Sequence, residues 1–137
     1  MTFPTAPSGQ MAEPVFLVDP ATNLPSTAGG IFNTGSTTAL AASATYTGSS
    51  RDVGVAAGTV QPFAFFNGFF ASDQAGVAYL DGSNDNSTWF TCATSPLLAG
   101  TPLTLSVPVM FRYHRARLVN GVTAQSTFVS NDAYTAG

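Results

Sequence analysis

Two β-prone runs joined by a turn-rich segment occupy residues 76–94, which read GVAYLDGSNDNSTWFTCAT. The first run alternates around Val77 and Tyr79, and the second contains Trp89 and Phe90. The Asp-Gly and Ser-Asn-Asp sequences between them supply residues that tolerate the positive φ angles of tight turns. The stretch therefore predicts a β-hairpin.

Other short runs lie on both sides of this hairpin, at spacings typical of β-sandwiches and barrels. Turn residues separate the runs, and Asn120-Gly121 predicts a second hairpin near the end of the chain. No stretch repeats apolar residues with the period of a helix for long. The runs cover residues 38–47, 61–71, 76–80, 87–94, 102–107, 111–119 and 122–129. The sequence therefore predicts an all-β sandwich of about seven or eight strands over residues 36–129.

The first 35 residues differ from this pattern, because five prolines prevent a long helix or a central strand there. We predict an extended N-terminal arm over residues 1–35 and a short tail over residues 130–137. An apolar segment between Pro14 and Pro20 would aggregate unless it paired with another surface, so we expect it to bind a partner as an added strand. Packing back on its own domain is the alternative. The segment consists of Val15, Phe16, Leu17 and Val18.

Five phenylalanines crowd residues 63–70. Side chains of a strand alternate between two faces, so these rings cannot all face one core. We expect some of them to lie on the surface and to be buried against another subunit, which would favour association by several kcal/mol. The predicted partner-binding residues of this run are Phe65, Phe66, Phe69 and Phe70.

Charged residues make up only 8% of the chain, and its four basic residues are all arginines. Soluble monomers normally carry much more surface charge, so this composition favours contact with protein partners in an assembly. The formal net charge of −3 would not attract nucleic acid. Neither a signal segment nor an apolar run of membrane-spanning length is recognisable. We expect no nucleic-acid or membrane partner, and synthesis in a host cytoplasm.

Catalytic and metal-binding patterns are not recognisable in the sequence. His114 is the only histidine, and without a nucleophile motif beside it we expect a packed or hydrogen-bonded imidazole. The loop 81–86 lacks the spacing and the terminal Glu of a calcium loop, which favours turn chemistry. The single cysteine, Cys92, cannot form an intrachain disulfide and is expected in the core. We predict no enzymatic activity, no metal and no cofactor.

The hairpin at residues 76–94 resembles one found in discoidin-like jelly rolls, where a strand, a Gly-Ser-Asn-Asp turn and a tryptophan occur together. A closer resemblance is to the small jelly-roll proteins of tailed-phage virions. It rests on Gly-Ser-Ser-Arg-Asp at 48–52, Ser-Asp-Gln-Ala-Gly at 72–76, Trp89, and the Arg-Tyr-His-Arg to Ala-Gln segment at 112–125. Residues 15–25 are also similar to the openings of phage structural proteins.

This resemblance implies a jelly-roll sandwich with a structural role at the capsid surface of a virion. It implies a decoration or cement protein that binds the major capsid protein and associates as a homotrimer. Two alternatives stay open: a tail or baseplate protein, and a host-surface carbohydrate-binding module. In the carbohydrate module Trp89 and Tyr79 would form a sugar-stacking platform, whereas in a structural protein Trp89 would be a core or interface anchor.

Overall fold

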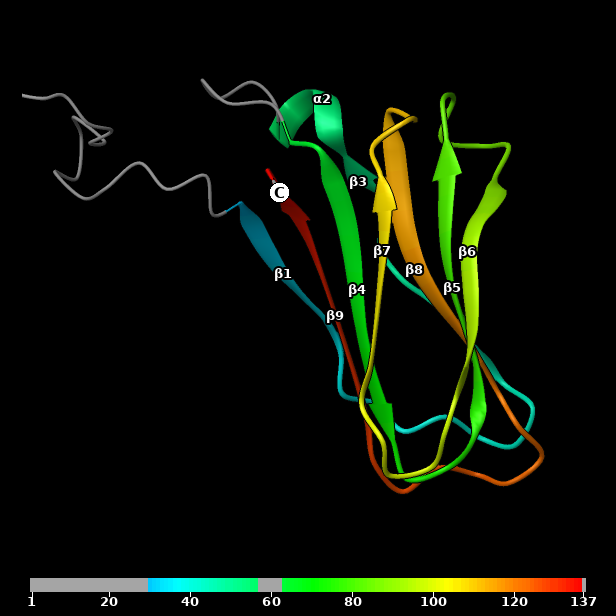
Figure 1. Cartoon of the computed structure of the whole chain (residues 1–137). Coiled ribbons are helices and arrows are strands. Elements are labelled where there is room, and N and C mark those ends of the chain that lie inside the picture. The colour runs from blue at the N-terminus through cyan, green and yellow to red at the C-terminus, as the bar shows by residue number, and fades with distance from the viewer. Residues whose placement is uncertain (1–29, 57–62, 137) are drawn as a thin grey trace, which may run out of the picture.

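The computed structural model describes residues 30–56 and 63–136, which form two antiparallel β-sheets packed face to face (Figure 1). This architecture confirms the predicted all-β sandwich. The predicted arm segment, Val15 to Val18, lies outside the described residues. The described part of the chain contains no helix that is long and apolar enough to cross a membrane.

Nine strands and one four-residue helix make up the described part of the chain. The strands are β1 (Ile31–Ser36), β2 (Thr45–Thr47), β3 (Arg51–Asp52), β4 (Phe65–Ser72), β5 (Gly76–Ser83), β6 (Phe90–Leu97), β7 (Leu103–Pro108), β8 (Tyr113–Asn120) and β9 (Phe128–Thr135), and the helix is α2 (Val53–Ala56). The first sheet has the order β1-β9-β4-β7. The second has the order β2-β8-β5-β6, and β3 also pairs with β8.

The antiparallel pairs are nested along the chain: β5 pairs with β6, β4 with β7, β2 with β8, and β1 with β9. A single long hairpin rolled around itself produces this order. Leaving aside the two-residue β3, eight strands are therefore connected as in a double-sheet jelly roll. The predicted hairpin at residues 76–94 is confirmed as the β5–β6 pair at the tip of this long hairpin.

The second predicted hairpin is wrong, because β8 and β9 belong to different sheets. The side chain of Asn120 is buried and donates to the carbonyl oxygens of Ala41 and Thr123, each at 2.9 Å. Asn120 therefore anchors two loops instead of forming a tight turn. The chain after Gly121 crosses to the other sheet, so that both strands contribute to one core.

The core lies between the sheets. It is built from every second side chain of each strand, because side chains alternate between the core and the outer face. In β4, Phe66 and Phe70 are fully buried, whereas Phe65 and Phe69, each one residue earlier, point outward. Ten buried apolar residues form the core cluster: Phe66, Phe70, Ala78, Leu80, Leu97, Val107, Ala116, Leu118, Phe128 and Tyr134. Cys92 is exposed, contrary to expectation, because it lies at the bulge in the pairing of the edge strand β6.

Both ends of the sandwich differ from the sequence prediction. β1 occupies residues that were assigned to the arm, and β9 runs through residues that were assigned to the tail. The core-facing side of β9 is half polar, since Ser130 and Asp132 are buried there between Phe128 and Tyr134. Asp132 is held by a two-pronged ion pair with Arg51, at 2.8 and 3.1 Å, and by the amide of Asn33 at 3.0 Å. An apolar pattern therefore could not reveal this strand.

Candidate interaction surfaces

The outer face of the first sheet carries no charged side chain. The strand registers place thirteen residues on it: Phe32, Thr34, Phe65, Asn67, Phe69, Ala71, Thr104, Ser106, Pro108, Val129, Asn131, Ala133 and Thr135. They are aromatic, aliphatic, amide and hydroxyl residues. Most protein surfaces alternate both signs of charge, so a neutral sheet face with exposed rings has the composition of a binding surface.

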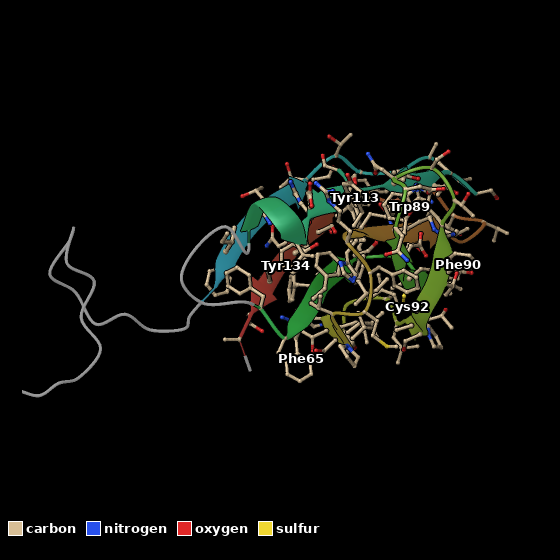
Figure 2. The ribbon with its side chains drawn as sticks, turned by 90° about the horizontal axis from the view of Figure 1, so that it is seen from above. Phe65, Trp89, Phe90, Cys92, Tyr113 and Tyr134 are labelled. Carbon is tan, nitrogen blue, oxygen red and sulfur yellow. The ribbon has the colours of Figure 1, made fainter. Side chains whose placement is uncertain are left out.

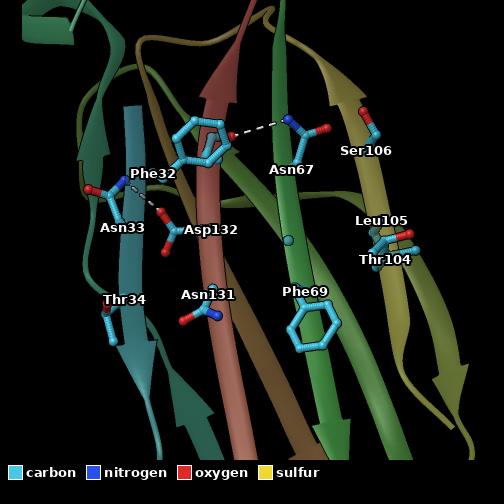
Figure 3. A pocket seen from close by; sticks show the side chains of 12 residues that line it. Phe32, Asn33, Thr34, Asn67, Phe69, Thr104, Leu105, Ser106, Asn131 and Asp132 are labelled. Carbon is cyan, nitrogen blue, oxygen red and sulfur yellow. Dashed lines mark hydrogen bonds between the residues drawn. The ribbon is translucent and has the colours of Figure 1, made fainter. Parts of the chain in front are cut away.

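A groove with a volume of about 560 Å³ crosses this face over all four strands (Figure 3). Phe32 from β1 and Phe69 from β4 contribute their rings, and Phe32 is 74% exposed. The amide nitrogen of Asn67 donates to the hydroxyl of Thr135 at 3.0 Å, which fixes the orientation of that amide. The Asn131 side chain makes no hydrogen bond to any described residue. The groove therefore presents one fixed amide, on β4, and one free amide, on β9, beside two aromatic rings.

The four predicted partner-binding phenylalanines of β4 divide equally between the two faces of the strand. Phe65 and Phe69 lie on the outer face, as a surface role requires. Phe66 and Phe70 are wrong as partner-binding residues, because both have no exposed surface and form part of the core. The reason is the two-residue period of a strand, which separates neighbours in the sequence. Phe32 was missed, because residues 1–35 were assigned to the arm.

The outer face of the second sheet carries a buried carboxylate between two arginines. Asp81 is 2% exposed and accepts from Arg115 at 3.1 Å and from Arg117 at 2.8 and 3.0 Å. The Arg115 guanidinium lies 4.2 Å from the centre of the Trp89 ring, and that of Arg117 lies 4.0 Å from the Tyr79 ring. These stacked layers place both arginines on the strand face, paired with one carboxylate and packed on one aromatic ring each.

This arrangement excludes Trp89 as a core anchor, whereas its role as an interface anchor stays a prediction. The Trp89 side chain is half-buried, and its ring packs on the guanidinium group of Arg115. It does not belong to the core between the sheets. One face of the Trp89 ring and one face of the Tyr79 ring are covered by arginine, and the sugar-stacking role of this pair stays a prediction.

Large apolar side chains are exposed at the end of the sandwich where β4, β6 and β8 begin, which Figure 2 shows from above. Phe65 is 36% exposed, Phe90 is 56% and Met110 is 77%. The Phe90 ring stacks on Phe111 with ring centres 6.0 Å apart. We call Phe65, Phe90, Met110 and Phe111 the apolar end. Only Phe65 among them was predicted to bind a partner.

His114 is fully buried on the core side of β8, which confirms a packed and hydrogen-bonded imidazole. Its ring stacks on Phe66, and its Nδ1 lies 2.9 Å from the Tyr134 hydroxyl. Burial lowers the pKa of His114 from 6.5 to about 4, so the ring is neutral at physiological pH. The ring has no exposed atom with which to act on a substrate.

The loop after β5 uses its oxygens for turn formation, as predicted. The Asp85 carboxylate accepts from the backbone N–H groups of Ser87 at 2.9 Å and Thr88 at 2.7 Å, and from the Ser83 hydroxyl. These hydrogen bonds, led by that from Thr88, lower the pKa of Asp85 to about 2. Among the described residues, no group of three or more His, Cys, Asp or Glu side chains is placed to hold a metal ion.

Comparison with known proteins gives the family. The family described as the N-terminal domain of the uncharacterised protein YqxG matches residues 21–135. The chain belongs to this family. No curated protein sequence matches it.

Two solved structures are similar to the fold. The crystal structure of the PBSX exported protein XepA has a TM-score of 0.71 and 24% sequence identity, over 96% of this chain and 51% of that one. The chain thus spans about half the length of XepA. A structure of Bacillus endospore appendages, described as a novel family of disulfide-linked pili, has a TM-score of 0.43 and 14% identity, over 84% of this chain and 99% of that one. The likeness to XepA shows that the two proteins share this sandwich fold.

Proposed function

We propose that the chain is a non-enzymatic structural protein of a phage-related particle and that it attaches to other protein subunits through the apolar end. The observation that carries the proposal is the exposure of Phe65, Phe90 and Met110 at one end of a chain with few charges. Several large apolar residues that are exposed at one end of a domain mark a protein contact, and burial of a few such residues supplies most of the association free energy.

The phage-related context is supported by two observations. The fold is shared with an exported protein of PBSX, and the sequence resembles small virion proteins in the segments 48–52, 72–76 and 112–125. On that resemblance we propose a place on the capsid surface, the major capsid protein as the partner, and association of three copies. A tail or baseplate location uses the same surface and differs in copy number.

The proposal of a non-enzymatic role rests on the environment of the only histidine. His114 is enclosed by Phe66 and Tyr134 and has no exposed surface. A general base needs access to a proton on a substrate or nucleophile, and this imidazole has none.

The test is the protein composition of particles purified from the organism that encodes the chain. Hundreds of copies per particle indicate the capsid, and a few to tens indicate the tail. If the chain is missing from purified particles, the proposal is wrong.

A pair of matched variants then tests the apolar end. Met110→Asp places a charge just before β8, and Val122→Asp places one just after it, at the opposite end of the same strand. Both residues are largely exposed, at 77% and 86%, so neither change should unfold the domain. We expect Met110→Asp to lower the amount bound to particles, because an unpaired charge is costly to bury in an interface. Equal incorporation of both variants would contradict attachment through the apolar end.

A further inference from the structure

The groove on the first sheet has a chemistry different from that of the apolar end. Phe32 and Phe69 stand on β1 and β4, with β9 between them. Phe32 lies opposite Ala133 of β9, and Phe69 lies opposite Asn131. Standard strand spacings then separate the Cα atoms of Phe32 and Phe69 by roughly 12 Å, a distance that linked sugar rings can span.

The outward-facing polar side chains of the groove are neutral and both donate and accept, and Asp132, which also lines the groove, has a buried side chain that is ion-paired with Arg51. The amide nitrogen of Asn67 donates to the Thr135 hydroxyl and to the Ala133 carbonyl, and its oxygen points towards β7 on the Ser106 side, where it can accept (Figure 3). Asn131 lies on the central strand beside Phe69, and its amide makes no hydrogen bond to a described residue. The exposed hydroxyls of Thr104 and Ser106 line the β7 side.

The two aromatic rings and the neutral amides and hydroxyls of the groove favour some classes of ligand over others. A phosphate or other anion would require a cation, and the outward positions of this face carry none. A sugar ring has an apolar C–H face that packs on an aromatic ring, and hydroxyls that both donate to and accept from amides. A mostly apolar groove with a few placed polar groups is also the usual form of a small-ligand site.

We propose that this groove binds a neutral oligosaccharide, with Phe32 and Phe69 as stacking residues and Asn67 and Asn131 as hydrogen-bonding residues. None of the four residues of the apolar end lines the groove, although Phe65 lies on the same face as Asn67 and two residues before it. Binding of a host glycan or of a glycan on a neighbouring protein would use the same contacts.

The experiment measures binding of the purified full chain to neutral probes by titration calorimetry: cello-, malto-, manno- and chito-oligosaccharides. We expect at least one of them to bind. Phe69→Ala removes a stacking ring and Asn131→Ala removes the free amide, and each should weaken binding by about tenfold or more. Phe90→Ala is the matched control, because Phe90 is also an exposed phenylalanine but lies outside the groove. It should bind like the unaltered chain.

Thermal melting of each variant checks that the fold is intact. Failure of every probe to bind, or equal binding by Phe69→Ala and the unaltered chain, would overturn the proposal. The proposal would also be overturned if the groove proved to be filled by a second copy of the chain, with loss of self-association in Phe69→Ala and no sugar bound. Two variants distinguish sugar binding from attachment to particles. Met110→Asp should leave sugar binding unchanged, and Phe69→Ala should leave attachment to particles unchanged.

Discussion

The buried imidazole of His114 makes the stability of the domain dependent on pH. The Tyr134 hydroxyl donates to the Arg51 carbonyl at 3.0 Å, so its oxygen accepts from Nδ1–H of His114 at 2.9 Å. The other ring nitrogen, Nε2, has no hydrogen-bond partner among residues 30–56 and 63–136. It therefore carries a lone pair in the neutral ring, and protonation would put an unpaired charged N–H group into the core next to Phe66.

The sign and the size of the effect follow from the pKa. Burial lowers the pKa of His114 from 6.5 to about 4. Above about pH 6.5 the ring is neutral in both states and its full contribution to stability is present. As the pH falls from there towards 4, the unfolded chain binds a proton that the folded chain does not, and the free energy of unfolding decreases. The total loss is about 3 kcal/mol, at about 1.4 kcal/mol for each unit of pKa difference.

The assay is urea unfolding followed by tryptophan fluorescence at several pH values between about 4 and 7. His114→Gln should remove this decrease, since glutamine does not titrate, whatever its effect on stability at neutral pH. Backbone hydrogen bonds lower the pKa values of Asp73 and Asp85. Protonation of these carboxylates therefore lowers the free energy of unfolding mainly below about pH 4, outside the range used to test His114. If the unaltered chain and His114→Gln lose stability in parallel across the window, His114 does not cause the dependence and the argument from its burial is refuted.

Three further predictions test the packing, each by the free energy of unfolding in urea. Phe66→Ala should cost about 3–5 kcal/mol and Phe65→Ala less than about 1 kcal/mol, because only the first ring is in the core; similar costs would contradict the alternation of β4. Asp81→Asn should cost about 2 kcal/mol by leaving two arginines unpaired, whereas Asp52→Asn, in a more exposed pair, should cost less than about 1 kcal/mol. Trp89→Ala should cost only about 1 kcal/mol, since the ring covers a guanidinium outside the core, and a cost of 3 kcal/mol or more would show that it is a core anchor.

Local pattern was sufficient for the fold class and for one hairpin. The alternation around Val77 and Tyr79, with the turn residues that follow, predicts β5 and β6 because neighbouring strands joined by a short turn pair with one another. The crowding of phenylalanines in residues 63–70 also predicts that some rings face outward, but the register of the strand determines which ones do.

The candidate sites were less visible in the sequence, for identifiable physical reasons. β9 presents polar residues to the core, and Asp132 is acceptable there only because Arg51 and Asn33 reach it from other strands. The groove needs Phe32 and Phe69, which are far apart in the chain. They lie on the same sheet face because β1 and β4 both pair with β9. Neither contact has a signal within a short stretch of sequence.

The sequence by itself determined that the chain is all-β, low in charge and poor in catalytic groups, because composition and two-residue alternation are local properties. The tertiary structure alone decided which strands pair and which outward residues share a surface. Its nested pairing joins β1 to β9 across almost the whole described chain, and that long-range closure brings the groove together. The same closure sends β8 and β9 to opposite sheets despite the Asn120-Gly121 turn signal, since burying both strands on one core outweighs a local turn preference.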